Sequence, residues 1–334
     1  MSFSTDWKET VDPGEKARFE MLSKQITDIQ KRRMERAGQP FRAVHRKAIA
    51  AAKAELRIGN DAPEALRVGL FKAPATHTCW VRFSNGSGSH QADRKQDVRG
   101  IAVKVFDVPG PKALPGAQAT TQDFLAIQIP ATPFKNAEEF VAFVRGAAQP
   151  ATLLPKLVGE FGLVATVKMV AKLAGTARYK VDSFATARFF SALPIRFGPY
   201  AVKYAFVPRQ EAGAAVAHTG DDFYRADLVK RLAAGPLLYD LKVQPFVDEK
   251  RTPIENAAIE WRESDSAYLK VAELYLPQQD IASAEGGALA ERVEAASFDP
   301  WHALEEHRPL GAMMRARGVA YFDSTQQRKA AAEP

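Results

Sequence analysis

The chain has 334 residues, 46% of them hydrophobic, which is enough to bury a large core in one big domain or in two ordinary ones. Lysine and arginine exceed aspartate and glutamate by 46 − 39 = 7, but these charges are scattered and form no run typical of nucleic-acid binding. The single cysteine, Cys79, excludes an internal disulfide framework and any CxxC motif. We expect Cys79 to be buried and the protein to be cytoplasmic.

The opening residues 13–38 predict a helix. Phe19, Leu22, Ile26 and Ile29 form a narrow apolar seam at helical spacing, and Gly38 supplies a stop. Before this helix, MSFSTDWKET contains no apolar stretch of signal-peptide length. We expect residues 1–40 to form a helical arm that packs on a larger body.

From residue 55 onward the sequence changes to short β-like runs separated by Gly, Pro, Asn and Asp. The runs are 56–58, 66–71, 76–84, 99–106, 123–130, 200–208, 237–247 and 268–277. Eight runs without regularly alternating helices predict an antiparallel β-barrel. Helical segments at 136–146, 151–179, 221–234 and in the last third make the class α+β. We expect a single domain over residues 1–334, with the barrel and its helical insertions in 41–280 and a C-terminal segment in 281–334.

Segment 151–179 is the most apolar stretch of the chain. Lys156, Glu160, Lys168 and Lys172 interrupt it well short of the uncharged run of about 18 residues that a spanning helix needs. We therefore expect a core helix here and no stable membrane insertion.

Five of the six histidines carry no pattern that indicates a site. In HALEEH, His302 and His307 have neither HExxH nor HxxEH spacing. His77, His90 and His218 have no acidic or cysteine neighbours at ligand spacing. The chain contains no GxSxG, and NGSGSH at 85–90 is not a dinucleotide-binding GxGxxG.

His45 differs in its surroundings, because FRAVHRKA places it directly before the barrel strands and three residues after Arg42. In the following block, Arg82 and Ser84 lie on the same side of a strand by alternation. Further along this block, Asp97, Arg99 and Lys104 could be either site residues or solvated charges. Each of these signals is weak when taken alone.

Near the end of the chain, RARGVAYFDSTQQRK at 315–329 places a tyrosine between arginines. If this stretch is helical, about 100° of rotation per residue brings Arg317, Tyr321 and Arg328 within roughly 40° of one another. The pattern indicates a phenol flanked by two permanent cations.

These blocks, taken in order, resemble the successive signatures of haem catalases. They are R-x-V-H at 42–45, V-R-F-S at 81–84, D-x-R-G-x-A-V-K at 97–104 and R-x-x-x-Y-x-D-S-x-x-x-R at 317–328. The chain is most similar to the short bacterial catalase-related haem peroxidases, which keep the barrel and lack the long tail of true catalases. TPIENAAIEW at 252–261 and FDPWHALEEHRPLGAMMRAR at 298–317 also resemble motifs of that subfamily. The resemblance covers roughly residues 30–330.

The resemblance implies a catalase-like core that binds haem b through its iron. Tyr321 would be the proximal ligand, a coordination known for catalases. Arg317, one helical turn earlier, would donate to the phenolate and favour its charged form. Arg42, Arg82 and Arg328 would pair with the haem propionates, since a planar guanidinium suits a carboxylate.

On the other haem face, the resemblance assigns His45 to take a proton from the peroxide and return it to the departing oxygen, with Ser84 orienting the ring. Val44, Phe140 and Phe143 match positions that wall the haem pocket and its approach.

One departure from the family pattern bears on function. True catalases carry N-N-T-P after the strand that here reads DFLAIQIP, and the first asparagine aligns best with Ile127, while the matching phenylalanine appears as Thr132. Gln128 is adjacent but should point to the other face of the strand. We therefore expect a peroxidase that reduces hydrogen peroxide or organic hydroperoxides with an organic electron donor, with weak catalase activity at most.

Two alternatives stay open. One is a haem enzyme that isomerises or cleaves fatty-acid hydroperoxides, which an apolar access channel would favour. The other is a non-catalytic haem-binding or haem-sensing protein. The expected partners are a small peroxide and an organic reductant, and a homo-oligomer is left open.

Overall fold

The structure of the chain is a computed structural model that describes residues 3–114, 120–147, 150–210 and 218–331. These residues contain nine strands and seven α-helices. The strands are β1 (Ala48–Ile58), β2 (Ala75–Asn85), β3 (Arg99–Val105), β4 (Gln122–Ile127), β5 (Phe189–Phe190), β6 (Ile195–Phe197), β7 (Tyr200–Pro208), β8 (Leu237–Pro245) and β9 (Leu269–Leu276). The helices are α1 (Glu15–Ala37), α2 (Ala137–Ala147), α3 (Pro150–Phe161), α4 (Leu163–Gly175), α5 (Phe223–Ala234), α6 (Ala284–Ala295) and α7 (Ala312–Gln327).

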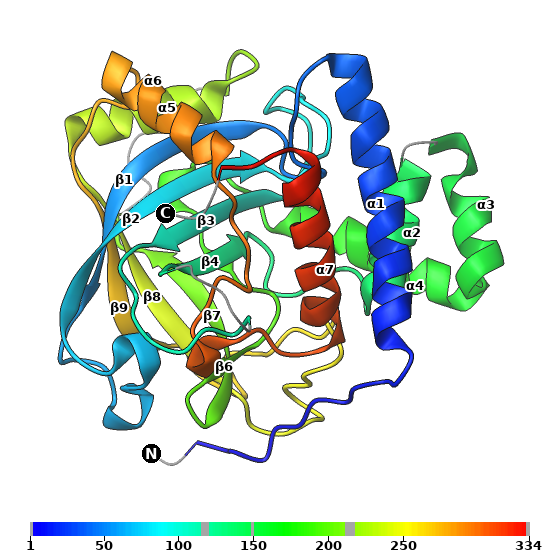
Figure 1. The fold of residues 1–334 in the computed structure, drawn as a ribbon, viewed down its shortest axis with the longest axis horizontal. Coiled ribbons are helices and arrows are strands. Elements are labelled where there is room, and N and C mark those ends of the chain that lie inside the picture. The colour runs from blue at the N-terminus through cyan, green and yellow to red at the C-terminus, as the bar shows by residue number, and fades with distance from the viewer. Residues whose placement is uncertain (1–2, 115–119, 148–149, 211–217, 332–334) are drawn as a thin grey trace.

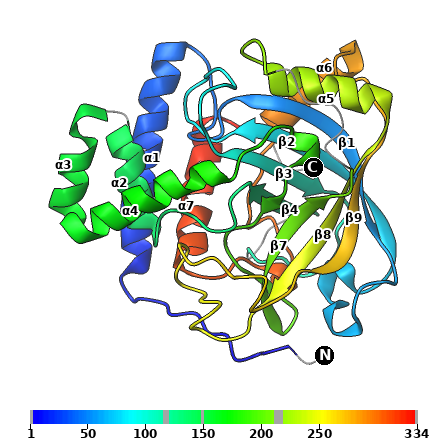
Figure 2. The ribbon, with the colours of Figure 1, turned by 180° about the vertical axis from the view of Figure 1, so that it is seen from behind.

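The strands close into a barrel. The sheet order is β5-β4-β3-β2-β1-β9-β8-β7-β6, and an additional pairing joins β5 to β7, so that eight strands form a ring and β6 extends from β7. Neighbouring strands are antiparallel throughout. Closure removes exposed strand edges. The predicted α+β class and antiparallel barrel are confirmed; α5 and α6 lie at the top of the barrel in both views, and the other helices lie on one side of it (Figures 1 and 2).

Two of the predicted strands differ from the structure. The first runs from Ala48 and not from residue 56, because its alanine-rich start is held by pairing with β2 along almost its whole length. Residues 66–71 are not a strand, since they lie in and around two short 3-10 turns, Glu64–Leu66 and Gly69–Phe71. Gly69 has a φ of 51°, and a side chain there would collide with the ring of His307. The apolar residues of 66–71 are present because their side chains are buried in the core, and not because they pair in a strand.

The expected core helix over 151–179 is also corrected by the structure. Gly162, with a φ of 80°, separates α3 from α4, and the two helices form a hairpin that lies beyond α2 at the side of the molecule away from the barrel (Figures 1 and 2). Leu157 and Met169 anchor the hairpin, but much of its remaining apolar surface is exposed. Within the described ranges, every helix is too short or too polar to span a bilayer.

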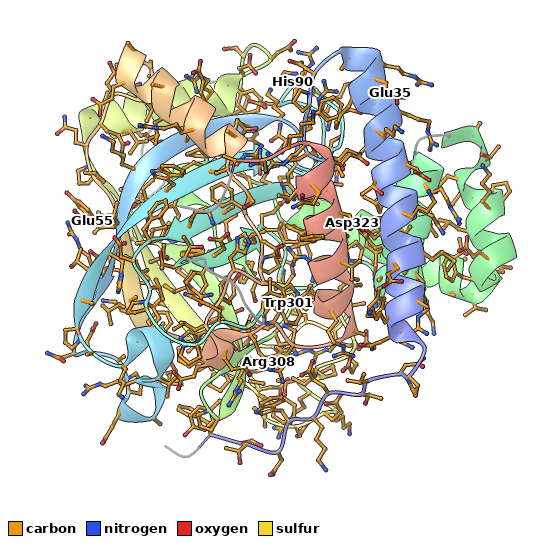
Figure 3. The ribbon with its side chains drawn as sticks, in the orientation of Figure 1. Glu35, Glu55, His90, Trp301, Arg308 and Asp323 are labelled. Carbon is orange, nitrogen blue, oxygen red and sulfur yellow. The ribbon has the colours of Figure 1, made fainter. Side chains whose placement is uncertain are left out.

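Helix α7 lies between α1 and the barrel, and segments about 300 residues apart hold it there (Figures 1 and 2). Asp323, labelled on α7 in Figure 3, accepts a hydrogen bond from the Ser23 hydroxyl of α1 at 2.6 Å. The Arg315 guanidinium binds the Glu15 carboxylate at 2.6 Å. With one side of α7 fixed against α1, its other side is presented to the barrel.

Candidate active site

A cavity of about 280 Å³ lies between α7, the helical arm and the barrel strands. Helices α1 and α2 contribute mainly apolar side chains to its wall, and α7 contributes both apolar and polar ones. The barrel strands, the loop before β1 and further loop residues such as Thr132, Leu193 and Phe298 supply the remaining lining. This cavity brings together nine of the ten residues singled out as site residues from the sequence: Arg42, Val44, His45, Arg82, Ser84, Phe140, Arg317, Tyr321 and Arg328.

The α7 wall of the cavity presents the phenol of Tyr321. The Arg317 Nη2 donates to the Tyr321 hydroxyl at 2.8 Å, as the one-turn spacing allows. The guanidinium carbon lies 5.0 Å from the centre of the phenol ring. Burial alone would lower the pKa of Arg317, but the charge and hydrogen bond of Tyr321, with smaller contributions from Tyr204 and Asp299, together raise it. Arg317 is therefore a fixed cation beside the phenol oxygen.

At one end of the cavity, three guanidiniums meet the C-terminal end of α6. Arg42 binds the Glu294 carboxylate at 2.9 Å, and Arg82 binds the same carboxylate. Arg328 donates to the Ala296 carbonyl at 2.7 Å, and Arg42 donates to the same carbonyl at 2.8 Å. The last carbonyls of a helix lack intrahelical partners, so cations are favoured at this position.

The charges of this arginine cluster (Arg42, Arg82 and Arg328) do not balance. Burial, followed by repulsion from Arg82, holds the pKa of Arg42 well below its usual value, and burial also lowers the pKa of Arg328. Glu294 is the carboxylate that the cluster contacts; burial would raise its pKa, but Arg82 and Arg42 together lower it. Two buried guanidiniums and the half-buried Arg42 against one carboxylate leave a site with a preference for further anionic groups, and planar guanidiniums suit carboxylates.

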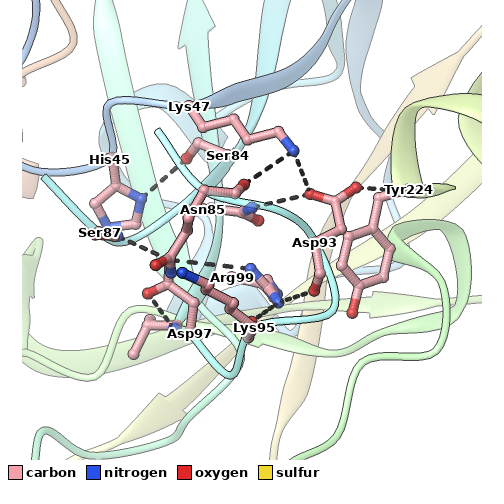
Figure 4. Close-up of polar contacts among 12 residues, drawn as sticks. His45, Lys47, Ser84, Asn85, Ser87, Asp93, Lys95, Asp97, Arg99 and Tyr224 are labelled. Carbon is pink, nitrogen blue, oxygen red and sulfur yellow. Dashed lines mark hydrogen bonds and ion pairs between the residues drawn. The ribbon is translucent and has the colours of Figure 1, made fainter. Parts of the chain in front are cut away.

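On the barrel side, His45 lies in the loop before β1 with a left-handed φ of 55°. Its Nδ1 is 2.9 Å from the Ser84 hydroxyl, and its backbone N–H donates to the Gly86 carbonyl at 2.9 Å (Figure 4). Arg82 donates to the His45 carbonyl at 2.8 Å. Part of the ring surface faces the cavity rather than bulk water. Burial, assisted by the nearby Arg82 and Arg317, lowers the pKa of His45 to about 3, so the ring is neutral at ordinary pH.

Gly100 provides the space that the His45 ring occupies. A Cβ at position 100 would lie 2.8 Å from Cε1 and 3.1 Å from Nδ1 of His45. Across the sheet, Gly100 pairs with Ser84 on β2 and with Ile127 on β4. Side chains opposite one another in a sheet share a face, so Ser84, Gly100 and Ile127 form one cross-strand row under the histidine.

Ile127 and its neighbour Gln128 point in different directions at the end of β4. Ile127 lines the cavity. Gln128, as expected, is directed elsewhere: its amide nitrogen donates to the Asp97 carbonyl at 3.2 Å and its oxygen accepts from the Arg99 backbone N–H. Thr132 also lines the cavity.

Behind the histidine, a buried polar network fixes the β2–β3 region (Figure 4). Lys47 binds the Asp93 carboxylate at 2.8 Å, and Asn85 donates to the same oxygen at 3.0 Å. Arg99 donates to the Asp93 carbonyl at 2.7 Å. Arg99 is thus buried rather than solvated, and so is Lys104, which binds Asp123 at 2.9 Å.

Of the three residues expected to wall the pocket, Val44 and Phe140 line the cavity. Phe143 packs instead against Phe134, with ring centroids 5.1 Å apart. Cys79 is fully buried, as expected, and burial raises the pKa of its thiol. In the described ranges no cluster of three or more His, Cys, Asp or Glu side chains could hold a bare metal ion.

The sequence reasoning missed Glu294 and the end of α6. Glu294 is 252 residues from Arg42 in the chain, and nothing in RVEAAS distinguishes it from a solvated helical glutamate. The several arginines among the quoted motifs imply a counter-ion but do not identify it.

Comparisons with known proteins support the fold. No family model and no curated protein matches the sequence. Among solved structures, a fungal catalase aligns with a TM-score of 0.67 and 19% identity, over 90% of this chain and 62% of its own. A bacterial catalase gives 0.65 and 21%, over 89% and 59%. Catalase A from Saccharomyces cerevisiae gives 0.68 and 16%, over 89% and 62%. The chain therefore has a catalase-like fold and spans about three fifths of the length of these catalases.

Proposed function

We propose that the protein is a haem-dependent peroxidase that reduces hydrogen peroxide or organic hydroperoxides with an organic electron donor. The observation that carries this proposal is a single cavity that holds a phenol backed by an arginine, a neutral histidine and an arginine cluster with excess positive charge. We also infer that residues 1–334 act as one haem domain, because the helical arm, the barrel and α7 all line this cavity.

The residues present fit haem b. A flat apolar macrocycle suits the aliphatic and aromatic part of the wall, and its two propionates would supply the anions that the arginine cluster lacks. Tyr321 would hold the iron through its phenol oxygen, with Arg317 stabilising negative charge on that oxygen. When bound, haem would supply the redox chemistry that the side chains lack, in which a peroxide is reduced at the expense of an organic electron donor.

His45 would perform the proton transfers at Nε2. Since Nδ1 lies against the Ser84 hydroxyl, a neutral ring whose Nδ1–H donates to Ser84 leaves a lone pair on Nε2. A pKa of about 3 keeps that lone pair available, so Nε2 can take the hydroperoxide proton and return it to the oxygen that leaves as water or an alcohol. Ser84 would therefore set the tautomer and the ring orientation.

Ile127 supports peroxidase rather than catalase chemistry. Oxygen release requires a second peroxide to be held beside the histidine, and an isoleucine side chain has no hydrogen-bonding group for that purpose. We expect the oxidation of an organic donor to exceed oxygen evolution.

A second candidate is the isomerisation or cleavage of fatty-acid hydroperoxides. The observation in its favour is the apolar wall that α1 contributes, with Phe19, Leu22 and Ile26. Such an enzyme would convert a lipid hydroperoxide without any donor, and a peroxidase would not.

The test uses purified protein with one equivalent of haem. We expect a stable ferric haem spectrum, a spectral change on adding peroxide, and donor-dye oxidation faster than oxygen release. An Ile127→Asn variant at equal haem content should shift the ratio toward oxygen release. Haem binding without any reaction with peroxide would favour a haem-binding protein, and donor-independent loss of a fatty-acid hydroperoxide would favour the second candidate.

A further inference from the structure

The α3–α4 hairpin carries most of the exposed large apolar side chains of the described structure. Of ten such residues, six lie between positions 154 and 170. They are Leu154, Val158, Leu163, Val164, Val167 and Val170, with exposed fractions of 53, 37, 65, 69, 58 and 40%. Singly exposed aliphatic residues are ordinary, but a contiguous exposed apolar patch on a soluble surface usually marks an interaction site.

Helix α4 has an amphipathic arrangement with two apolar sectors. At about 100° per residue, the exposed Leu163, Val164, Val167 and Val170 span roughly 120° of the helix surface. The adjoining sector contains Met169, which is buried and anchors the helix to the protein. The exposed sector is therefore additional to the face that the fold itself uses.

The charges around this surface are basic. In residues 150–175 the charged side chains are Lys156, Glu160, Lys168 and Lys172. Glu160 is paired with Arg145 of α2 at 2.5 Å, which compensates the one carboxylate of the hairpin. On α4, exposed Lys168 adjoins the exposed apolar sector, whereas Lys172 lies farther round the helix and donates to the Ala258 carbonyl at 3.3 Å. An apolar sector with a lysine at its border is the pattern of a helix that lies in the headgroup region of an anionic bilayer.

We propose that the α3–α4 hairpin docks the protein peripherally on anionic lipid surfaces, with the exposed sector of α4 inserted at the level of the headgroups. Charge complementarity favours lipid over a second copy of this chain, because pairing two copies of this hairpin would bring lysines of like charge together. The position of the hairpin at the outer side of the molecule, away from the barrel, leaves it accessible in both views (Figures 1 and 2).

Docking would also orient the cavity. Helix α2 directly precedes the hairpin, and its Phe140 and Val141 line the cavity, so a docked molecule would hold this wall near the lipid. The docking proposal does not rest on the proposed function, and its test requires neither haem nor peroxide.

The experiment measures co-sedimentation of the full chain with vesicles of phosphatidylcholine alone or of phosphatidylcholine with phosphatidylglycerol. We expect binding to the anionic vesicles, weakened by salt. The triple variant Leu163→Gln, Val164→Gln, Val167→Gln should bind at least about tenfold more weakly, because it removes the inserted aliphatic groups. Lys168→Gln should weaken binding about fivefold.

The matched control is Val11→Gln with Met21→Gln, since these residues are 62% and 55% exposed but lie outside the hairpin. This control should bind as the parent does, and all variants should unfold at the parental temperature. The proposal is overturned if the parent binds neither vesicle, or if the triple variant binds as well as the parent. It is overturned in favour of a dimer if the parent self-associates through the hairpin and does not bind vesicles.

A second measurement does not depend on removing side chains. A Val167→Cys variant can be labelled selectively with a polarity-sensitive dye, since the native Cys79 is buried. The dye emission should shift to the blue on anionic vesicles, and a dye on Met21→Cys should not shift. Equal emission from both positions in the presence of vesicles would contradict insertion of α4.

Discussion

A Gly100→Ala substitution should uncouple the histidine from the rest of the site. Its methyl group would lie 2.8 Å from His45 Cε1, whereas ordinary contacts begin near 3.4 Å, so the ring must retreat by about 3.4 − 2.8 = 0.6 Å. Retreat from β3 strains the 2.9 Å contact of Nδ1 with Ser84. Overpacking of this kind typically costs about 1–3 kcal/mol of stability. Misplacement of a reacting group by about 1 Å can cost on the order of 10²-fold in rate.

The assay is stopped-flow mixing of the haem-loaded protein with hydrogen peroxide. We expect Gly100→Ala to keep its haem and its ferric spectrum, because Tyr321 and the arginine cluster lie on other elements, and to react with peroxide about 10²-fold more slowly. Gly287→Ala is the matched control, since a Cβ there meets nothing within 4 Å. A Gly100→Ala protein that reacts at the parental rate, or one that fails to bind haem, would refute the reasoning.

Four other outcomes are expected. Tyr321→Phe should lose haem or the parental ferric spectrum, measured by absorption after gel filtration, whereas Tyr200→Phe should not; equal haem content in both would contradict the ligand assignment. His45→Ala should slow the reaction with peroxide by about 10²–10⁴-fold while haem affinity changes little. The rate of the parental protein should stay constant from neutral pH down to about pH 5, because the pKa of His45 is about 3. Glu294→Gln should destabilise the haem-free protein by about 2 kcal/mol, since Arg42 and Arg82 lose their partly exposed carboxylate. Added haem should raise the melting temperature of this variant by more than it raises that of the parent. Burial lowers the pKa of His307 to about 3, so between about pH 6.5 and pH 3 the unfolded chain binds a proton at His307 that the folded chain does not bind. This difference has no effect above about pH 6.5 and lowers the free energy of unfolding progressively as the pH falls toward 3. His307→Gln should therefore show a smaller loss of stability over that interval in urea titrations.

Local sequence patterns predicted the parts of the fold that depend on short-range chemistry. The arm helix is delimited by Gly38, which adopts the left-handed conformation expected at a helix end. Strands such as β2 and β7 follow from β-branched and aromatic runs. The start of β1 could not be predicted in this way, because its alanines have low strand propensity and are held by partners elsewhere in the chain.

The hairpin shows a second limit of sequence reasoning. The sequence of an apolar segment such as 151–179 shows its length and hydrophobicity, but these properties do not determine which of its faces is buried against the rest of the protein. Gly162 gave a visible signal for the break between α3 and α4, since a glycine with a positive φ can end one helix and begin another. Exposure of Val164 and Val167 depends on how the hairpin packs on α2, which is a tertiary property.

Site residues were predicted best where the motif spacing itself encodes proximity. Arg317 and Tyr321 are one helical turn apart, so their hydrogen bond follows once the segment is helical. Glu294 could not be found from the sequence, because its contacts with Arg42 and Arg82 are set by where α6 ends relative to the barrel.

The cross-strand row formed by Ser84, Gly100 and Ile127 links the register of the barrel to the proposed chemistry. Each of its members meets the His45 side of the cavity from a different strand: the serine bonds the ring, the glycine makes room for it, and the isoleucine lies beside it. A slip of one residue in β4 would exchange Ile127 for Gln128 at the cavity. The backbone of Asp97 and Arg99 opposes that slip, because it already satisfies both polar ends of the Gln128 amide. A substitution at position 127 is therefore the direct way to place an amide in this row, and under the proposed function a peroxide would meet His45 without an amide from β4 beside it.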